Sequence, residues 1–185
     1  MTLSQPQPLL TLEPLIEAVR AGVESGGWTL AGLQKTTSHQ FEGRWAGDTS
    51  RSAYLFFHLP SGPDWASLDV FLDETSQGLL GNLALVVEGC CLDRLGDPRA
   101  ALATLGHIAR SAIPAEHRAP VTLRLRLADG DQRPGDAEAE IRFKLGIPPA
   151  ALQGGAEAVA ALAATAVDAF RVILADGSLR PFLAE

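Results

Sequence analysis

The chain has 185 residues, of which 46% are hydrophobic and 20% charged, and its formal net charge is -7 at pH 7. This length and composition are typical of one globular domain with a sizeable core. The acidic balance argues against broad binding to DNA or RNA, because neutralising phosphate groups requires a basic surface. It is compatible with a basic protein partner.

The ends of the chain differ from its middle. Residues 1–10 are polar and contain prolines, so we expect a flexible N-terminal arm, then a single domain over 11–177 and a C-terminal tail over 178–185. No secretory signal opens the chain and no apolar run approaches a membrane span, which predicts a cytoplasmic protein without membrane contact. The adjacent Cys90 and Cys91 are poorly placed for a disulfide and are expected to be buried, inert thiols at a strand end.

Apolar residues at helical spacing predict a first helix after Thr11, its expected N-cap. The helix should end at Gly26 and Gly27, since glycine readily adopts the left-handed conformation found after helices. The pattern that follows is weak, and Phe41 and Trp45 are assigned to a strand only by their bulk between turn residues.

The next segments have a clearer pattern. Alternation over 53–59 and 65–73, and an apolar run over 83–87, predict three strands joined by short loops as an antiparallel meander. Both faces of 53–59 carry large side chains, which is expected of a central strand covered on two sides.

The second half of the chain is predicted to contain a helix, a hairpin and another helix. Asp97 and Pro98 are a strong helix start, and alternating residues over 121–145 form the hairpin. An alanine-rich helix should run from the glycines at 154–155 to Gly177. The hairpin is expected to bury four apolar residues: Leu123, Leu125, Ile141 and Phe143. On its charged face, antiparallel pairing can set two arginines against two glutamates: Arg124, Arg126, Glu138 and Glu140.

Motifs for chemistry are missing from the sequence. The four histidines lack metal-ligand spacing, and no phosphate-binding glycine pattern or Gly-x-Ser-x-Gly motif occurs. We therefore expect no catalytic residue, no metal and no cofactor.

From Asp97 to Ala175 the chain reads as a capped helix, a charged hairpin ending in IRFKLGIPP, and a long helix. This order resembles the YbjN-like family and, more distantly, the small acidic chaperones of type III secretion. The resemblance implies an α+β fold, with helices on one face of an antiparallel sheet in the order α-β-β-β-α-β-β-α. It also implies a non-enzymatic homodimer that pairs through the helix before the hairpin, or an adjoining strand, and binds extended segments of a client protein.

The expected partner is therefore a protein client, and a basic one, such as a nucleic-acid-binding protein, suits the acidic chain. Exposed aromatic residues and arginines are enriched at interfaces. The candidate partner-binding residues are Tyr54, Phe56, Trp65, Phe71, Arg124, Arg126 and Arg142.

Two other functions compete with protein binding. One is a small-molecule binder or enzyme with a cleft between the meander and a helix, in which His58 or Asp69 would supply polar groups. The other is direct binding of single-stranded nucleic acid, which the net charge disfavours. Its stacking platform would combine three aromatic residues with two arginines: Trp45, Tyr54, Phe56, Arg44 and Arg51.

Overall fold

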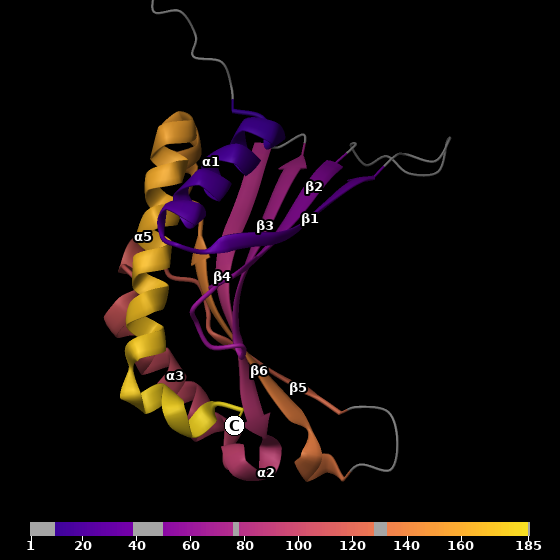
Figure 1. The fold of residues 1–185 in the computed structure, drawn as a ribbon, viewed down its shortest axis with the longest axis vertical. Coiled ribbons are helices and arrows are strands. Elements are labelled where there is room, and N and C mark those ends of the chain that lie inside the picture. The colour runs from indigo at the N-terminus through magenta and orange to yellow at the C-terminus, as the bar shows by residue number, and fades with distance from the viewer. Residues whose placement is uncertain (1–9, 39–49, 76–77, 128–132, 185) are drawn as a thin grey trace, which may run out of the picture.

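The computed structural model describes residues 10–38, 50–75, 78–127 and 133–184. Its framework is a six-stranded antiparallel sheet with the strand order β1-β2-β3-β4-β6-β5 (Figure 1). The strands are β1 (Thr29–Ser38), β2 (Ser50–His58), β3 (Ala66–Thr75), β4 (Gly78–Cys91), β5 (Thr122–Arg126) and β6 (Glu138–Gly146). The first four strands form a meander, and the β5–β6 hairpin joins it through pairing of β6 with β4.

Three helices cover one face of this sheet. These are α1 (Leu12–Ser25), α3 (Pro98–Ala112) and α5 (Gly155–Ala175), and the short helices α2 (Leu92–Leu95) and α4 (Pro149–Gln153) lie in the connections (Figure 1). The predicted fold class, an α+β domain with an antiparallel sheet and helices on one face, is confirmed. In the part of the chain with described coordinates, no helix lies on the opposite face, which we call the open face.

The core fills the space between the sheet and the helices. Alternate residues of the strands point towards the helices, among them Leu55, Leu68, Leu85 and Phe143, and each is at most 1% exposed. They meet the apolar stripes of α1 and α5, and the whole forms one hydrophobic cluster. Burial of this kind supplies most of the driving force for folding, so the helices and the sheet form one cooperative unit.

The structure adds one strand to the predicted order, because β1 precedes the three predicted meander strands. Two features explain why the sequence did not predict β1. A bulge between Leu30 and Gly32 breaks the two-residue period, and an edge strand needs few apolar residues. The predicted strand around Phe41 and Trp45 lies outside the described residues.

Most helix ends agree with the predicted signals, although Thr11, at the N-cap position of α1, makes no side-chain cap hydrogen bond. Helix α1 stops before Gly26, and Gly27 has a φ of +83°. Asp97 caps α3 by accepting a hydrogen bond from the backbone N–H of Arg99 at 3.1 Å, with Pro98 as the first helical residue. The short helix α4 was not predicted.

Two predictions about covered surfaces are wrong. Leu125, expected in the buried face of the hairpin, is 45% exposed, because β5 is an edge strand that lies beyond the helices. Strand β2, expected to be covered on both sides, keeps Tyr54 and Phe56 at 39% and 40% exposure.

Helix α5 is more apolar than the sequence reading allowed. Its 21 residues reach a hydropathy of 1.8, so length and composition alone would let it cross a membrane, contrary to the prediction that no apolar run approaches a span. Core helices pass the same criterion. Here one side of α5 packs on α1 and the sheet, and Val159, Ala166 and Phe170 are fully buried.

The C-terminal segment, predicted as a tail, packs against the end of β4. It contains the 3₁₀ helix Gly177–Phe182, whose Leu179 is buried. Leu183 forms a β-bridge with Gly89, and the Ala184 N–H donates a hydrogen bond to the Glu88 carbonyl at 3.1 Å. This contact places residues 183–184 beside the open face.

Candidate functional site

The open face carries an aromatic patch formed by Tyr54, Phe56 and Phe71. These residues alternate with core residues along β2 and β3, so their rings point away from the helices. The ring centroids of Tyr54 and Phe71 lie 4.9 Å apart with a 46° tilt, a favourable aromatic pair. Tyr54 and Phe56 remain exposed, although an apolar ring in water gives up stabilisation that burial would provide.

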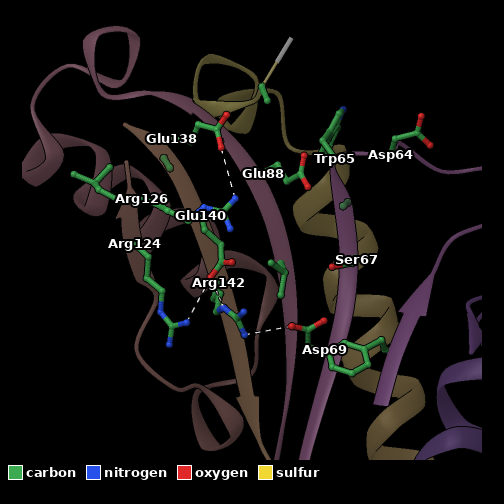
Figure 2. Close-up of a pocket in the computed structure, with 17 residues that line it drawn as sticks. Asp64, Trp65, Ser67, Asp69, Glu88, Arg124, Arg126, Glu138, Glu140 and Arg142 are labelled. Carbon is green, nitrogen blue, oxygen red and sulfur yellow. Dashed lines mark hydrogen bonds and ion pairs between the residues drawn. The ribbon is translucent and has the colours of Figure 1, made fainter. Parts of the chain in front are cut away.

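Next to the aromatic patch lies a depression of about 680 Å³, shown in Figure 2. Phe56 and Trp65 line one side, and the β5–β6 hairpin lines the other. Its charged residues are five carboxylates and three guanidinium groups, a net charge of -2: Asp64, Asp69, Glu88, Glu138, Glu140, Arg124, Arg126 and Arg142. The depression is thus both partly apolar and acidic.

Arg142 is the centre of an ion-pair network in this depression. Its Nε donates a hydrogen bond to Glu140 Oε1 at 2.6 Å, and its Nη1 lies 3.3 Å from Asp69 Oδ2 (Figure 2). The Arg142–Asp69 pair joins β6 to β3 and passes over β4, whose open-face residues Ala84 and Val86 are only 2% and 8% exposed. The pair therefore braces three strands.

The pKa values in this network follow from its geometry. Burial raises the pKa of Asp69, and the positive charge of Arg142 partly offsets that rise. The hydrogen bond from Arg142 lowers the pKa of Glu140. Arg142 thus stabilises the charged form of both carboxylates.

The other two arginines also have partners within the chain. Arg124 Nη1 lies 3.7 Å from Glu140 Oε1, and Arg126 Nη2 lies 3.6 Å from Glu138 Oε2. These are the cross-strand pairs predicted from the hairpin, and the strand register confirms them. All three arginines proposed for partner binding are therefore already paired with carboxylates.

The seven candidate residues share the open face. Phe56, Trp65 and the three arginines line the depression, and Tyr54 and Phe71 lie in the aromatic patch. The sequence reasoning missed Asp64 and Glu88. A signal was present for Glu88, since it is the one charged residue in the strand segment LALVVEGCC.

The structure shows where the residues of the two alternative sites lie, the small-molecule cleft and the nucleic-acid platform. The space between sheet and helices is packed, and the depression, on the opposite face, includes Asp69 but not His58. In the nucleic-acid platform, Arg51 points to the helix side of β2 and forms ion pairs with Glu74 and Glu13. Arg44 and Trp45 lie outside the described residues.

The two cysteines, Cys90 and Cys91, do not line the depression. Within the described ranges, no group of three or more His, Cys, Asp or Glu side chains could hold a metal ion. Cys90 is a free, buried thiol at the end of β4, and burial raises its pKa, which makes it a poor nucleophile. Cys91 is only half-buried.

Comparisons with known proteins do not assign the chain to a family. No protein-family model, curated protein or solved structure matches it. The resemblance to YbjN-like proteins stays a prediction, and the function must be inferred from the open face itself.

Proposed function

We propose that the protein is a non-enzymatic protein-binding domain that holds a client protein against the open face, as a chaperone or regulatory adaptor does. One observation carries this proposal: Tyr54 and Phe56 stay exposed on the face of the sheet that no described helix covers. Aromatic residues at the centre of a surface with a polar rim are the usual anchors of protein interfaces. The ion-paired hairpin beside them would form that rim.

Charge supports a basic client. The chain carries a net charge of -7, and the depression keeps a surplus of two carboxylates after its three arginines are counted. Complementary charge speeds association and disfavours acidic competitors. Because Arg124, Arg126 and Arg142 already have carboxylate partners, a client need not supply acidic groups for them.

The test is to remove the aromatic anchors without disturbing the core. Immobilised wild-type protein should retain its client from native lysate, whereas Tyr54→Ser/Phe56→Ser should bind on the order of a hundredfold more weakly. The double variant also removes the Tyr54–Phe71 ring pair, so urea unfolding should show a loss of stability on the order of 1 kcal/mol, too small to unfold the protein. The control is Val172→Ser on α5, which is 56% exposed on the helical side. Unchanged retention by the double variant, measured by quantitative mass spectrometry, would contradict the proposal.

We further propose that the domain works as a homodimer paired through α3. Leu102 of α3 is 40% exposed and lies in a groove with Gly106, Pro120 and Val121. Light scattering during size exclusion should give twice the chain mass at micromolar concentration, and Leu102→Arg should shift the protein to a monomer. A wild-type monomer under these conditions would remove the dimer from the proposal.

A further inference from the structure

The sheet has two edge strands, β1 and β5, and they differ in how well they are protected against pairing with another chain. Strand β5 is five residues long, carries Arg124 and Arg126, and closely follows Pro120. Short length, charge and proline are features that keep an edge from recruiting a further strand. Strand β1 is ten residues long and has one charged side chain, Lys35. Within the described ranges, no strand pairs with its outer side (Figure 1).

Most of the β1 edge is regular and accessible. The bulge between Leu30 and Gly32 distorts the start of the strand, but from Gly32 to Ser38 its register with β2 is unbroken. Residues 33–38 are exposed. Alternate residues of an antiparallel edge strand direct their N–H and C=O groups away from the sheet. The segment therefore offers a row of backbone donors and acceptors to an added strand.

Apolar surface lies on both faces of the sheet beside this edge. On the open face Gly32 pairs with Phe56, and a Cβ at Gly32 would lie 3.6 Å from the Phe56 ring. Because glycine has no side chain, β1 leaves that ring uncovered. On the helical face Leu33 is 43% exposed, although its partner Leu55 is fully buried. An added strand would cover both Phe56 and Leu33.

A second copy of the chain does not fit this edge. The open-face residues of β1 are small or polar, so β1 of a second copy would bring no large apolar side chain to the space over Gly32: Gly32, Gln34, Thr36 and Ser38. Strand β5 of a second copy would bring arginines there. The occupant that suits the edge is a different sequence, with a large apolar side chain opposite Gly32.

We propose that the β1 edge accepts an extended segment of the client as an additional antiparallel strand, with a large apolar side chain over Gly32 against the ring of Phe56. In strand addition, main-chain hydrogen bonds supply affinity and alternate side chains supply specificity. The edge and the aromatic patch then form one continuous contact. This inference rests on the proposed function, because it names how the client binds beside the open face.

Backbone methylation of a peptide tests the proposal. The probe is a fluorescent peptide of ten residues, the length of β1, in which phenylalanine alternates with threonine and each end is a lysine. Two modified peptides carry N-methyl groups on alternate amides, one on each edge of the extended chain. One of them should bind at least about tenfold more weakly than the other, because its methyl groups face β1 and remove hydrogen bonds.

Equal binding by the two methylated peptides would show that only side chains make the contact and would overturn the proposal. Failure of wild-type protein to bind the unmodified peptide would also overturn it.

A variant of the protein tests the space over Phe56. Gly32→Val fills that space at an ordinary contact distance and should weaken binding of the unmodified peptide about tenfold, although valine suits a strand. The matched control is Gly146→Val in β6, where the new Cβ meets no atom within 4 Å and β1 is far across the sheet. The control should bind like the wild type. Equal affinities of the two variants would contradict the proposal.

The outcome is separable from that of the proposed function. If Tyr54→Ser/Phe56→Ser abolishes client retention while the two methylated peptides bind equally, the client binds the open face but not as an added strand. If the aromatic double variant retains the client fully, the proposed function itself fails. A dimer that the unmodified peptide dissociates and Leu102→Arg does not would place a second copy on the β1 edge and overturn the proposal.

Discussion

Gly22→Ala is expected to destabilise the protein by about 2 kcal/mol, although alanine is the better helix former. Gly22 lies where α1 crosses α5, and an added Cβ would lie 2.3 Å from the Ala160 carbonyl oxygen and 2.7 Å from the Ala163 Cβ. One of these contacts is backbone, so no side chain can rotate away and the two helices must separate. The free energy of unfolding, measured with urea, should fall accordingly.

Gly106→Ala is the matched control in α3, and both glycine variants are compared in the Leu102→Arg background because Gly106 lines the proposed dimer groove. There the new Cβ meets only the flexible tip of Arg110, at 3.4 Å. With no clash, the helix preference of alanine should stabilise the protein by about 1 kcal/mol. Opposite signs for these two substitutions support the close α1–α5 packing, and stabilisation by Gly22→Ala would contradict it.

Arg142→Met is expected to cost about 2 kcal/mol at neutral pH. The variant leaves Asp69 without its cation, and the side chains of this pair are only 21% and 22% exposed. Arg126→Met is the control: Arg126 is 83% exposed and 3.6 Å from its partner, so its loss should cost less than about 0.5 kcal/mol. Equal costs in urea denaturation would show that the network is not a brace.

The cost of Arg142→Met should shrink as the pH falls. Burial already raises the pKa of Asp69, and removal of Arg142 raises it further, so the penalty for its charge is relieved when the pH falls through that raised value. In the wild type, the lowered pKa of Glu140 reflects stability that is present above the unfolded pKa and lost in acid. Both effects reduce the difference in free energy of unfolding between the wild type and Arg142→Met as the pH falls. A difference in free energy of unfolding that grows in acid would contradict the role of Arg142 in stabilising the charged forms of Asp69 and Glu140.

Local patterns predicted the hairpin well. Alternation assigned each residue of β5 and β6 to a face, and the cross-strand pairs Arg124–Glu140 and Arg126–Glu138 followed from antiparallel pairing. The cap at Asp97 and the glycines after α1 were also readable, because capping depends on neighbouring residues.

The features that the sequence did not predict depend on contacts between segments that are far apart in the chain. The exposure of Leu125 follows from the position of β5 at the sheet edge, which alternation does not encode. The Arg142–Asp69 pair crosses an intervening strand, so neither residue's neighbours reveal it. Asp64 and Glu88 line one depression only because the turn before β3 and the end of β4 meet.

The most direct test of the open face as a docking surface is site-specific photo-crosslinking. A photo-reactive amino acid placed at Phe56 should crosslink to the client in native lysate, and the same group placed at Val172 on α5 should not. The proposed function predicts a discrete crosslinked band at position 56, with the client contact mapped by mass spectrometry to a segment that combines apolar and basic residues. Crosslinking at position 172 but not at 56 would place the client on the helical side and contradict it.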